Sequence, residues 1–165
     1  MTKRAIRIEG DVAYVALTKG YEAVIDASDV PLVEGCNWFA LVTPRAVYAV
    51  RADCSGPKQR AVMLHRVLMG TPEGLYVDHI DGDGLHNRRS NLREATKQQN
   101  NHNARTRSDN SSGYKGVSLD SGRWRARIML DKKSRLLGYF GCPTAAHFAY
   151  IKASRQLHGE FGRVF

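Results

Sequence analysis

An aspartate and a histidine stand side by side in the middle of the chain, where a short apolar run ends. Asp78 supplies a hard carboxylate oxygen that suits Mg²⁺, and His79 is a natural base near neutral pH. Asn100 adds a neutral amide oxygen. One carboxylate, one amide and one histidine are too few for a closed cage, but they suit a metal ion that keeps waters and takes phosphate oxygens. These residues therefore predict hydrolysis of a phosphodiester bond, with His79 activating the water.

The predicted elements around this pair must bring its side chains together. Adjacent side chains on a strand point to opposite faces. Residues 76–80 are predicted as a strand that ends in the turn residues 81–84, so Asp78 and His79 can converge there. Residues 91–100 lack Gly and Pro and are predicted as a helix that covers the site. Candidate caps for that helix are Ser90 and Asn91.

This region resembles the HNH nuclease family, specifically the phage and intron-type homing endonucleases. A lone Asp-His pair would mean nothing, so the resemblance depends on the order and the gaps of several segments. It implies a ββα-metal (HNH) core, in which a β-hairpin and a helix surround one divalent ion, Mg²⁺ or alternatively Mn²⁺. The segments are Leu64-His65-Arg66, Val77-Asp78-His79-Ile80-Asp81-Gly82, Asn87-Arg88, Asn91-Leu92-Arg93, Thr96 and Asn100-Asn101.

The same resemblance implies a role for each matching residue. Asp78 and Asn100 are expected as metal ligands, and His79 as the general base. Asn91 is expected to orient His79, because a base needs the right tautomer and direction. Arg93 is expected near the phosphate. Near alternatives to Asn100 as second ligand are Asn101, His102 and Asn103.

Positive charge is concentrated in the last third of the chain. The sequence has 25 Lys and Arg against 16 Asp and Glu, a net charge of +9. Residues 1–64 carry a net +1, residues 65–103 are neutral, and residues 104–165 carry +8. A basic segment of this kind predicts a polyanionic partner, of which nucleic acid is the commonest in a cytosol. The alternative is a solvated basic surface.

The basic segment is predicted as a three-stranded antiparallel sheet backed by one helix. The strands are expected at residues 114–119, 123–130 and 134–140, and the helix at 143–158. Pro143 suits the first position of that helix and Gly159 its end. In the second strand, Trp124, Ala126 and Ile128 alternate with three arginines, so one face is apolar and the other basic.

The module resembles the Apetala-type (ethylene-response-factor) DNA-binding domain, whose sheet enters the major groove. The matching segments are Gly113–Val117, Arg123–Ile128, Leu137–Phe140 and the alanine-rich run from Ala145 to Ala153. Ser118, Met129 and Leu136 replace the plant domain's usual Arg, Arg and Trp, so its target sequence does not transfer. Double-stranded DNA is the expected partner. The expected contacts are Lys115, Arg123, Arg125, Arg127, Lys132, Lys133 and Arg135.

The whole chain is predicted to be of the α+β class and to have four parts. Residues 1–58 form a β-rich region whose role the sequence does not reveal, and residues 59–103 form the nuclease core. Residues 104–112 are polar and predicted as a linker, and residues 113–165 form the DNA-binding domain. Expected local elements are strands at 12–17, 21–25 and 47–51, a turn at 18–20, a short helix at 28–33 and a helix within 61–69 that stops near Gly70.

Composition narrows the remaining classes of function. The three cysteines lie far apart, which predicts a reducing cytosol and no cysteine-based zinc site. No apolar run approaches a membrane span and no signal peptide is visible, so we expect no membrane partner. Nothing implies a protein partner, and the expected location is the cytoplasm of a bacterial host, if the chain is phage-encoded. The alternatives are a non-catalytic DNA-binding protein with a degenerate nuclease fold and, more weakly, an RNA-binding or RNA-cutting protein.

Overall fold

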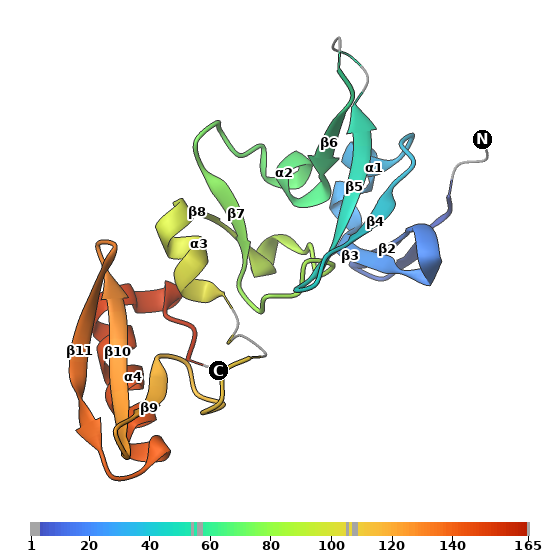
Figure 1. The fold of residues 1–165 in the computed structure, drawn as a ribbon. Helices are drawn as coiled ribbons and strands as arrows, with labels where there is room; N and C mark the ends of the chain where they lie inside the picture. The colour runs from blue at the N-terminus through green and yellow to red at the C-terminus, as the bar shows by residue number, and fades with distance from the viewer. Residues whose placement is uncertain (1–3, 54, 56–57, 105, 107–108, 165) are drawn as a thin grey trace. The chain divides into compact units, whose positions relative to one another are not determined.

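Strands that are neighbours in the sequence pair antiparallel to form each of the small sheets (Figure 1). The computed structural model describes residues 4–53, 55, 58–104, 106 and 109–164. The chain divides into two units, residues 1–97 and residues 98–165, and each is described by itself. Within the described ranges, no helix has the length and apolar character needed to cross a membrane.

The first sheet confirms the hairpin predicted near the N-terminus. Strands β1 (Ile6–Glu9), β2 (Val12–Ala16) and β3 (Glu22–Asp26) pair in that order. The turn between β2 and β3 is the 3-10 segment η1 (Thr18–Gly20), as the Thr-Lys-Gly sequence predicted. The segments η2 (Ala27–Asp29) and α1 (Val30–Val33) follow, so the expected short helix is also present.

The second sheet corrects the expectation for residues 61–69. Strands β4 (Phe39–Val42), β5 (Val47–Asp53) and β6 (Arg60–Met63) pair in sequence order, and the helix α2 (Leu64–Met69) starts only after β6. Residues 61–63 are therefore strand, because they complete the backbone ladder beside β5. Gly70 ends α2 in the left-handed conformation that favours glycine, as expected.

The third sheet overturns the helix predicted at residues 91–100. Strand β7 (Tyr76–His79) pairs with β8 (Leu92–Ala95), which follows the 3-10 segment η3 (Arg89–Asn91). The helix α3 (Lys97–Asn103) begins later. Cross-strand pairing with β7 outweighs the helix propensity of residues 92–95, because Leu92 and Ala95 are buried in that sheet arrangement. Asn91 consequently caps no helix here.

The first unit has one continuous core to which all three of its sheets contribute. Since buried side chains of the first sheet cluster with those of α2, β7 and β8, the predicted β-rich region and most of the predicted nuclease core fold as one body. The buried members are Ala13, Val15, Leu17, Ala23, Ile25, Val33, Trp38, Ala49, Leu64, Leu68, Val77 and Leu92.

The second unit contains a three-stranded sheet and one long helix, as predicted. Strands β9 (Val117–Asp120), β10 (Arg123–Leu130) and β11 (Lys133–Phe140) form a sheet with β10 in the centre. The helix α4 (Pro143–His158) has the predicted bounds and ends at Gly159, where η4 (Gly159–Phe161) follows. Val117, Ala126 and Ala146 pack together between the sheet and α4.

Strand β9 starts three residues later than expected because Gly116 belongs to a tight turn. Its φ is +72°, and an added Cβ would lie 2.3 Å from the Tyr150 ring and 2.5 Å from the Arg127 carbonyl oxygen. Only glycine fits this approach. The turn thereby brings the start of β9 against both β10 and α4.

Helices and small antiparallel sheets together fit the expected α+β class. The unit boundary lies after Lys97, so residues 98–103, predicted as part of the nuclease core, belong to the second unit. The predicted linker, residues 104–112, also belongs to that unit, and residues 105, 107 and 108 of it lie outside the described residues. The ββα-metal core and the Apetala-type domain remain predictions.

Candidate active site and nucleic-acid interface

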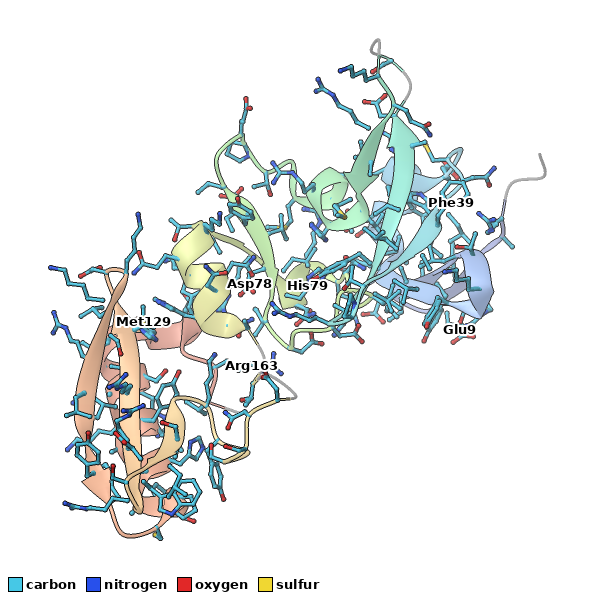
Figure 2. All side chains as sticks on the ribbon, in the orientation of Figure 1. Glu9, Phe39, Asp78, His79, Met129 and Arg163 are labelled. Carbon is cyan, nitrogen blue, oxygen red and sulfur yellow. The ribbon has the colours of Figure 1, made fainter. Side chains whose placement is uncertain are left out.

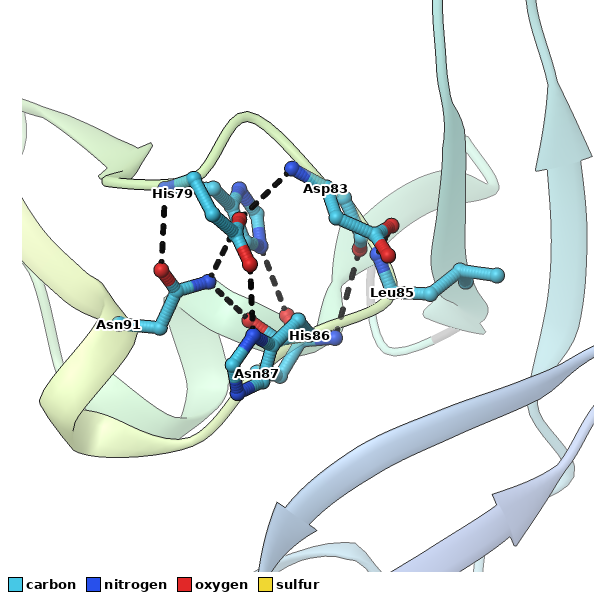
Figure 3. A network of polar contacts seen from close by, with 8 residues as sticks. His79, Asp83, Leu85, His86, Asn87 and Asn91 are labelled. Atoms are coloured by element: carbon cyan, nitrogen blue, oxygen red, sulfur yellow. Dashed lines mark hydrogen bonds and ion pairs between the residues drawn. The ribbon is translucent and has the colours of Figure 1, made fainter.

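His79 lies at the end of β7 and is held by a buried asparagine. Its Nε2 atom is 3.0 Å from Oδ1 of Asn87, whose side chain is fully buried (Figure 3). The Asn87 amide nitrogen donates to the Gly84 carbonyl, so its oxygen faces the ring. An amide oxygen can only accept, and Nε2 of His79 must therefore carry the proton. Nδ1 is then the ring nitrogen with the basic lone pair.

Burial keeps this imidazole neutral. The pKa of His79 is lowered mainly by desolvation, which outweighs the opposing bond to Asn87 and the charges of Asp81, Asp78 and Asp83. Burial also lowers the pKa of His65 to about 3, with the His79 charge as a smaller cause. The two rings meet edge to face at 5.0 Å between centroids. A neutral histidine with a fixed tautomer is the form that a general base requires.

Asn91 holds the loop that follows His79. Its Oδ1 accepts from the Asp81 backbone N–H at 3.1 Å. Its amide nitrogen donates to Oδ1 of Asp81 at 2.9 Å and to the His86 carbonyl at 2.8 Å (Figure 3). The resemblance led us to expect that Asn91 orients His79. The bond to the ring comes from Asn87 instead, and Asn91 ties both ends of the loop together.

The loop is also packed against both N-terminal sheets. Val24 of β3 accepts from the Asn87 N–H and donates to the Leu85 carbonyl, at 2.7 and 2.8 Å. A Cβ on Gly84 would lie 2.4 Å from the Val47 carbonyl oxygen and 2.6 Å from the Tyr48 ring. Glycine is therefore required where the loop crosses β5. The β-rich region, whose role was not readable from the sequence, thus fixes the loop that carries Asn87.

Two arginines connect the end of this loop to β3 and to η2. The Arg88 Nε donates to Asp26 at 2.7 Å, and the Arg89 backbone N–H donates to the other oxygen of Asp26. The Arg89 guanidinium forms a two-point ion pair with the buried Asp29. Charge-assisted hydrogen bonds between a guanidinium and a carboxylate at two points are among the stronger polar interactions in proteins. These residues lie about 60 positions apart in the chain, so the sequence offered no signal that they meet.

Asp78 forms a buried ion pair with Arg93. The two residues face each other directly across β7 and β8. Arg93 Nε and Nη2 lie 2.9 and 2.8 Å from Oδ2 of Asp78. The structure places Arg93 on the Asp78 carboxylate, and its expected position near a phosphate stays a prediction. Figure 2 labels Asp78 and His79, which come one after the other at the end of β7. Both are buried.

The two residues expected as metal ligands, Asp78 and Asn100, lie in different units of the chain. Among the described residues, no group of three or more His, Cys, Asp or Glu side chains could hold an ion by itself. Asp78 offers a carboxylate in the first unit. Asn100, the other expected ligand, is a half-buried residue of α3 in the second unit. Of its near alternatives, His102 is also half-buried, Asn101 is exposed and Asn103 is buried. Carboxylate and amide oxygens are each a type of donor that Mg²⁺ accepts, and Mg²⁺ usually keeps several waters besides.

In the second unit, three of the expected DNA contacts share one face of the sheet. Arg123, Arg125 and Arg127 alternate with Ala126 and Ile128, which are buried. This outer face, the side of the sheet opposite α4, therefore carries the three arginines. Lys133 and Arg135 pair directly with Leu130 and Ile128. Directly opposed residues share a face, so Lys133 and Arg135 belong to the other side of the sheet. Lys132 lies in the turn between β10 and β11, with a φ of +62°.

Lys115, a further expected contact, is tied to the end of α3. Its ammonium group donates to the carbonyls of His102 and Ala104, at 2.6 and 2.7 Å. A cation at this place satisfies carbonyl groups that a helix end leaves open. Burial lowers the pKa of Lys115 to about 8. The structure thus gives Lys115 a stabilising role within the second unit.

Comparisons with known proteins agree with the motif around His79. Residues 63–102 match the HNH endonuclease family model. Protein 3.8 of Escherichia phage T7 is 35% identical over 94 residues, which cover 56% of this chain and 77% of the relative. An uncharacterized HNH endonuclease of Acanthamoeba polyphaga mimivirus is 29% identical over 145 residues, or 87% of this chain and 74% of the relative. No solved structure matches the chain.

Proposed function

We propose that this chain is a metal-dependent DNA endonuclease of the homing type. The match of residues 63–102 to the HNH endonuclease family model and the similarity to a viral HNH endonuclease support the proposal. The proposed reaction is hydrolysis of a phosphodiester bond in double-stranded DNA, as a nick or a double-strand break. The observation that carries the proposal is the geometry of His79. This side chain is buried and neutral, Asn87 fixes its tautomer, and it follows directly on Asp78.

In the proposed mechanism, Nδ1 of His79 removes a proton from the attacking water. The imidazolium that forms still donates from Nε2 to Asn87, so the ring keeps its direction through proton transfer. The charges of Asp81, Asp78 and Asp83 favour this protonated ring. Asn91 acts on His79 indirectly, because it holds the loop that carries Asn87.

Asp78 and Asn100 are the residues proposed to hold one divalent ion, Mg²⁺ or Mn²⁺. When bound, such an ion would supply stabilisation of the negative charge that develops during hydrolysis. Arg93 bonds to one oxygen of Asp78, which orients the carboxylate and balances its charge in a buried place. Arg93 is therefore proposed to position Asp78, beside its expected place near the phosphate.

The outer face of the second unit is the proposed DNA-reading surface. Arg123, Arg125 and Arg127 share this face, and a two-stranded ribbon of such a sheet fits the major groove. The surplus of positive charge in residues 104–165 supports the proposal, because phosphate contacts dominate DNA affinity. If the nuclease region makes few sequence-specific contacts, a linked DNA-binding domain raises the local concentration of DNA near it.

The test is conversion of supercoiled plasmid and of source-genome DNA, with Mg²⁺, Mn²⁺ or a chelator. Wild type, His79→Ala and His86→Ala would be compared. His86 is a matched control, since it lies in the same loop and its side chain is 38% exposed. Metal-dependent cleavage that His79→Ala loses and His86→Ala largely keeps supports the proposal. Salt-sensitive binding by all three proteins without any cleavage would favour a non-catalytic DNA-binding protein.

A further inference from the structure

Exposed apolar side chains lie among the arginines of the outer face. Leu136 is 54% exposed, Met129 48% and Tyr139 40%. Leu136 pairs directly with Arg127, and Tyr139 pairs with Arg125. The register continues past an irregularity at Ala126 and Arg127, where Leu137 turns into the core. The outer face is therefore a ladder in which cationic and apolar side chains stand opposite each other.

The three arginines of this ladder differ in their availability. Arg125 bonds to Asp120 at 2.6 Å and to Ser118. Arg123 donates to the Tyr139 carbonyl, and its guanidinium lies over the Tyr139 ring at 5.7 Å. Within the described part of the chain, the Arg127 guanidinium has no side-chain or backbone partner. Arg127 is thus the arginine of this face whose donors are open to a ligand.

An exposed leucine directly opposite an arginine with available donors is suited to contact two neighbouring base pairs in the major groove. A surface that bound only phosphates would need cations and polar groups, and exposed leucine would add nothing. In the major groove, arginine bonds two acceptors of guanine, and an apolar side chain packs on the C5 methyl group of thymine. Directly paired residues have Cβ atoms about 5 Å apart, a distance that two neighbouring base pairs can span.

We propose that Arg127 and Leu136 form a base-reading pair that recognises a guanine next to a thymine in double-stranded DNA. This inference rests on the proposed DNA-reading function of the outer face and adds the bases that it reads. Arg127 bonds the guanine edge, and Leu136 covers the thymine methyl group. The arginine-bearing face is positive and DNA is negative, and this charge complementarity favours DNA as the ligand of the outer face.

The first step of the test is to select bound sequences from a random duplex pool with the full-length His79→Ala protein, which avoids cleavage. The enriched duplex is then made with thymine or with deoxyuridine, which lacks only the methyl group. Wild-type Leu136 should favour the thymine duplex about fourfold, the effect of one buried methyl group. Leu136→Ala should bind both duplexes equally. Leu157→Ala is the matched control, because Leu157 is an exposed leucine on α4.

Arg127→Ala distinguishes two negative results: that Arg127 and Leu136 do not read bases, and that the outer face does not bind DNA at all. If Arg127→Ala and Arg125→Ala leave affinity and its salt dependence unchanged, the outer face binds no DNA, and both proposals fall. If they weaken binding but thymine and deoxyuridine duplexes bind equally, only the base-reading pair is overturned. A selection without an enriched guanine-thymine step would also overturn it. Arg127 and Leu136 are exposed, so their replacement leaves the fold intact. Arg125 is half-buried and bonded to Asp120, so circular dichroism of Arg125→Ala must first show a folded protein.

Discussion

The amide oxygen of Asn87 lies 3.0 Å from Nε2 of His79, in a place where Asn87 is fully buried. This relationship decides which nitrogen of the histidine is basic. It also makes the catalytic proposal depend on a residue that the motif contains but to which we assigned no role. The loop between His79 and Asn91 places the side chain of Asn87 within hydrogen-bonding distance of the His79 ring.

Asn87→Ala should lower the maximal rate of DNA cleavage by about 10- to 100-fold, the usual effect of losing a residue that orients a functional side chain. DNA affinity should stay nearly unchanged, because Asn87 contacts the ring and the loop and is itself fully buried. Cleavage at saturating DNA and binding in chelator measure the two effects. Asn87→Asp keeps an acceptor for Nε2 and should recover part of the rate; equal loss in both variants would argue for a purely structural role.

Stability should fall in acid because of His65. Its pKa in the folded protein is lowered from 6.5 to about 3, mainly by burial. Below pH 6.5 the unfolded chain binds a proton that the folded chain excludes. The free energy of unfolding should therefore drop by up to about 1.4 kcal/mol per pH unit as the pH falls from about 6 towards 3. Urea unfolding across this range should show a shallower drop for His65→Phe. Parallel curves for the two proteins would contradict this assignment.

Arg89→Ala should destabilise the first unit by about 2–3 kcal/mol. Asp29 is buried, and the substitution leaves its carboxylate without the two-point pair. Arg88→Ala should cost less, because one of its partners, Asp11, is mostly exposed. Denaturant unfolding of both variants tests the difference. In the Asp29→Ala background, Arg89→Ala should have little further effect; an undiminished loss there would show that the pair is not the cause.

Lys115→Met should lower thermal stability and leave the salt dependence of DNA binding unchanged. Its ammonium group bonds the carbonyls of His102 and Ala104, so the substitution removes bonds within the second unit. Arg127→Ala should do the reverse, with unchanged stability and a salt slope reduced by about one. Titrations at several salt concentrations decide between the roles. A reduced slope for Lys115→Met would restore it as a DNA contact.

Local patterns were sufficient for several elements. The helix at 143–158 was predicted with its observed bounds, because Pro143, the alanines and Gly159 favour those positions whatever surrounds them. The hairpin around residues 18–20 and the strand alternation of β10 followed from the same kind of short-range preference. The Asp78-His79 pair could be singled out because carboxylate and imidazole have intrinsic chemistry.

Long-range contacts decided the rest. Residues 92–95 became β8 because pairing with β7 satisfies their backbone and buries Leu92, which a local helix preference cannot register. The partner of His79 was Asn87 and not Asn91, since the loop's path depends on its bonds to Val24 and on the space beside Tyr48. Residue types can thus name the groups capable of chemistry, but only packing between distant segments sets the distances and directions in which they act.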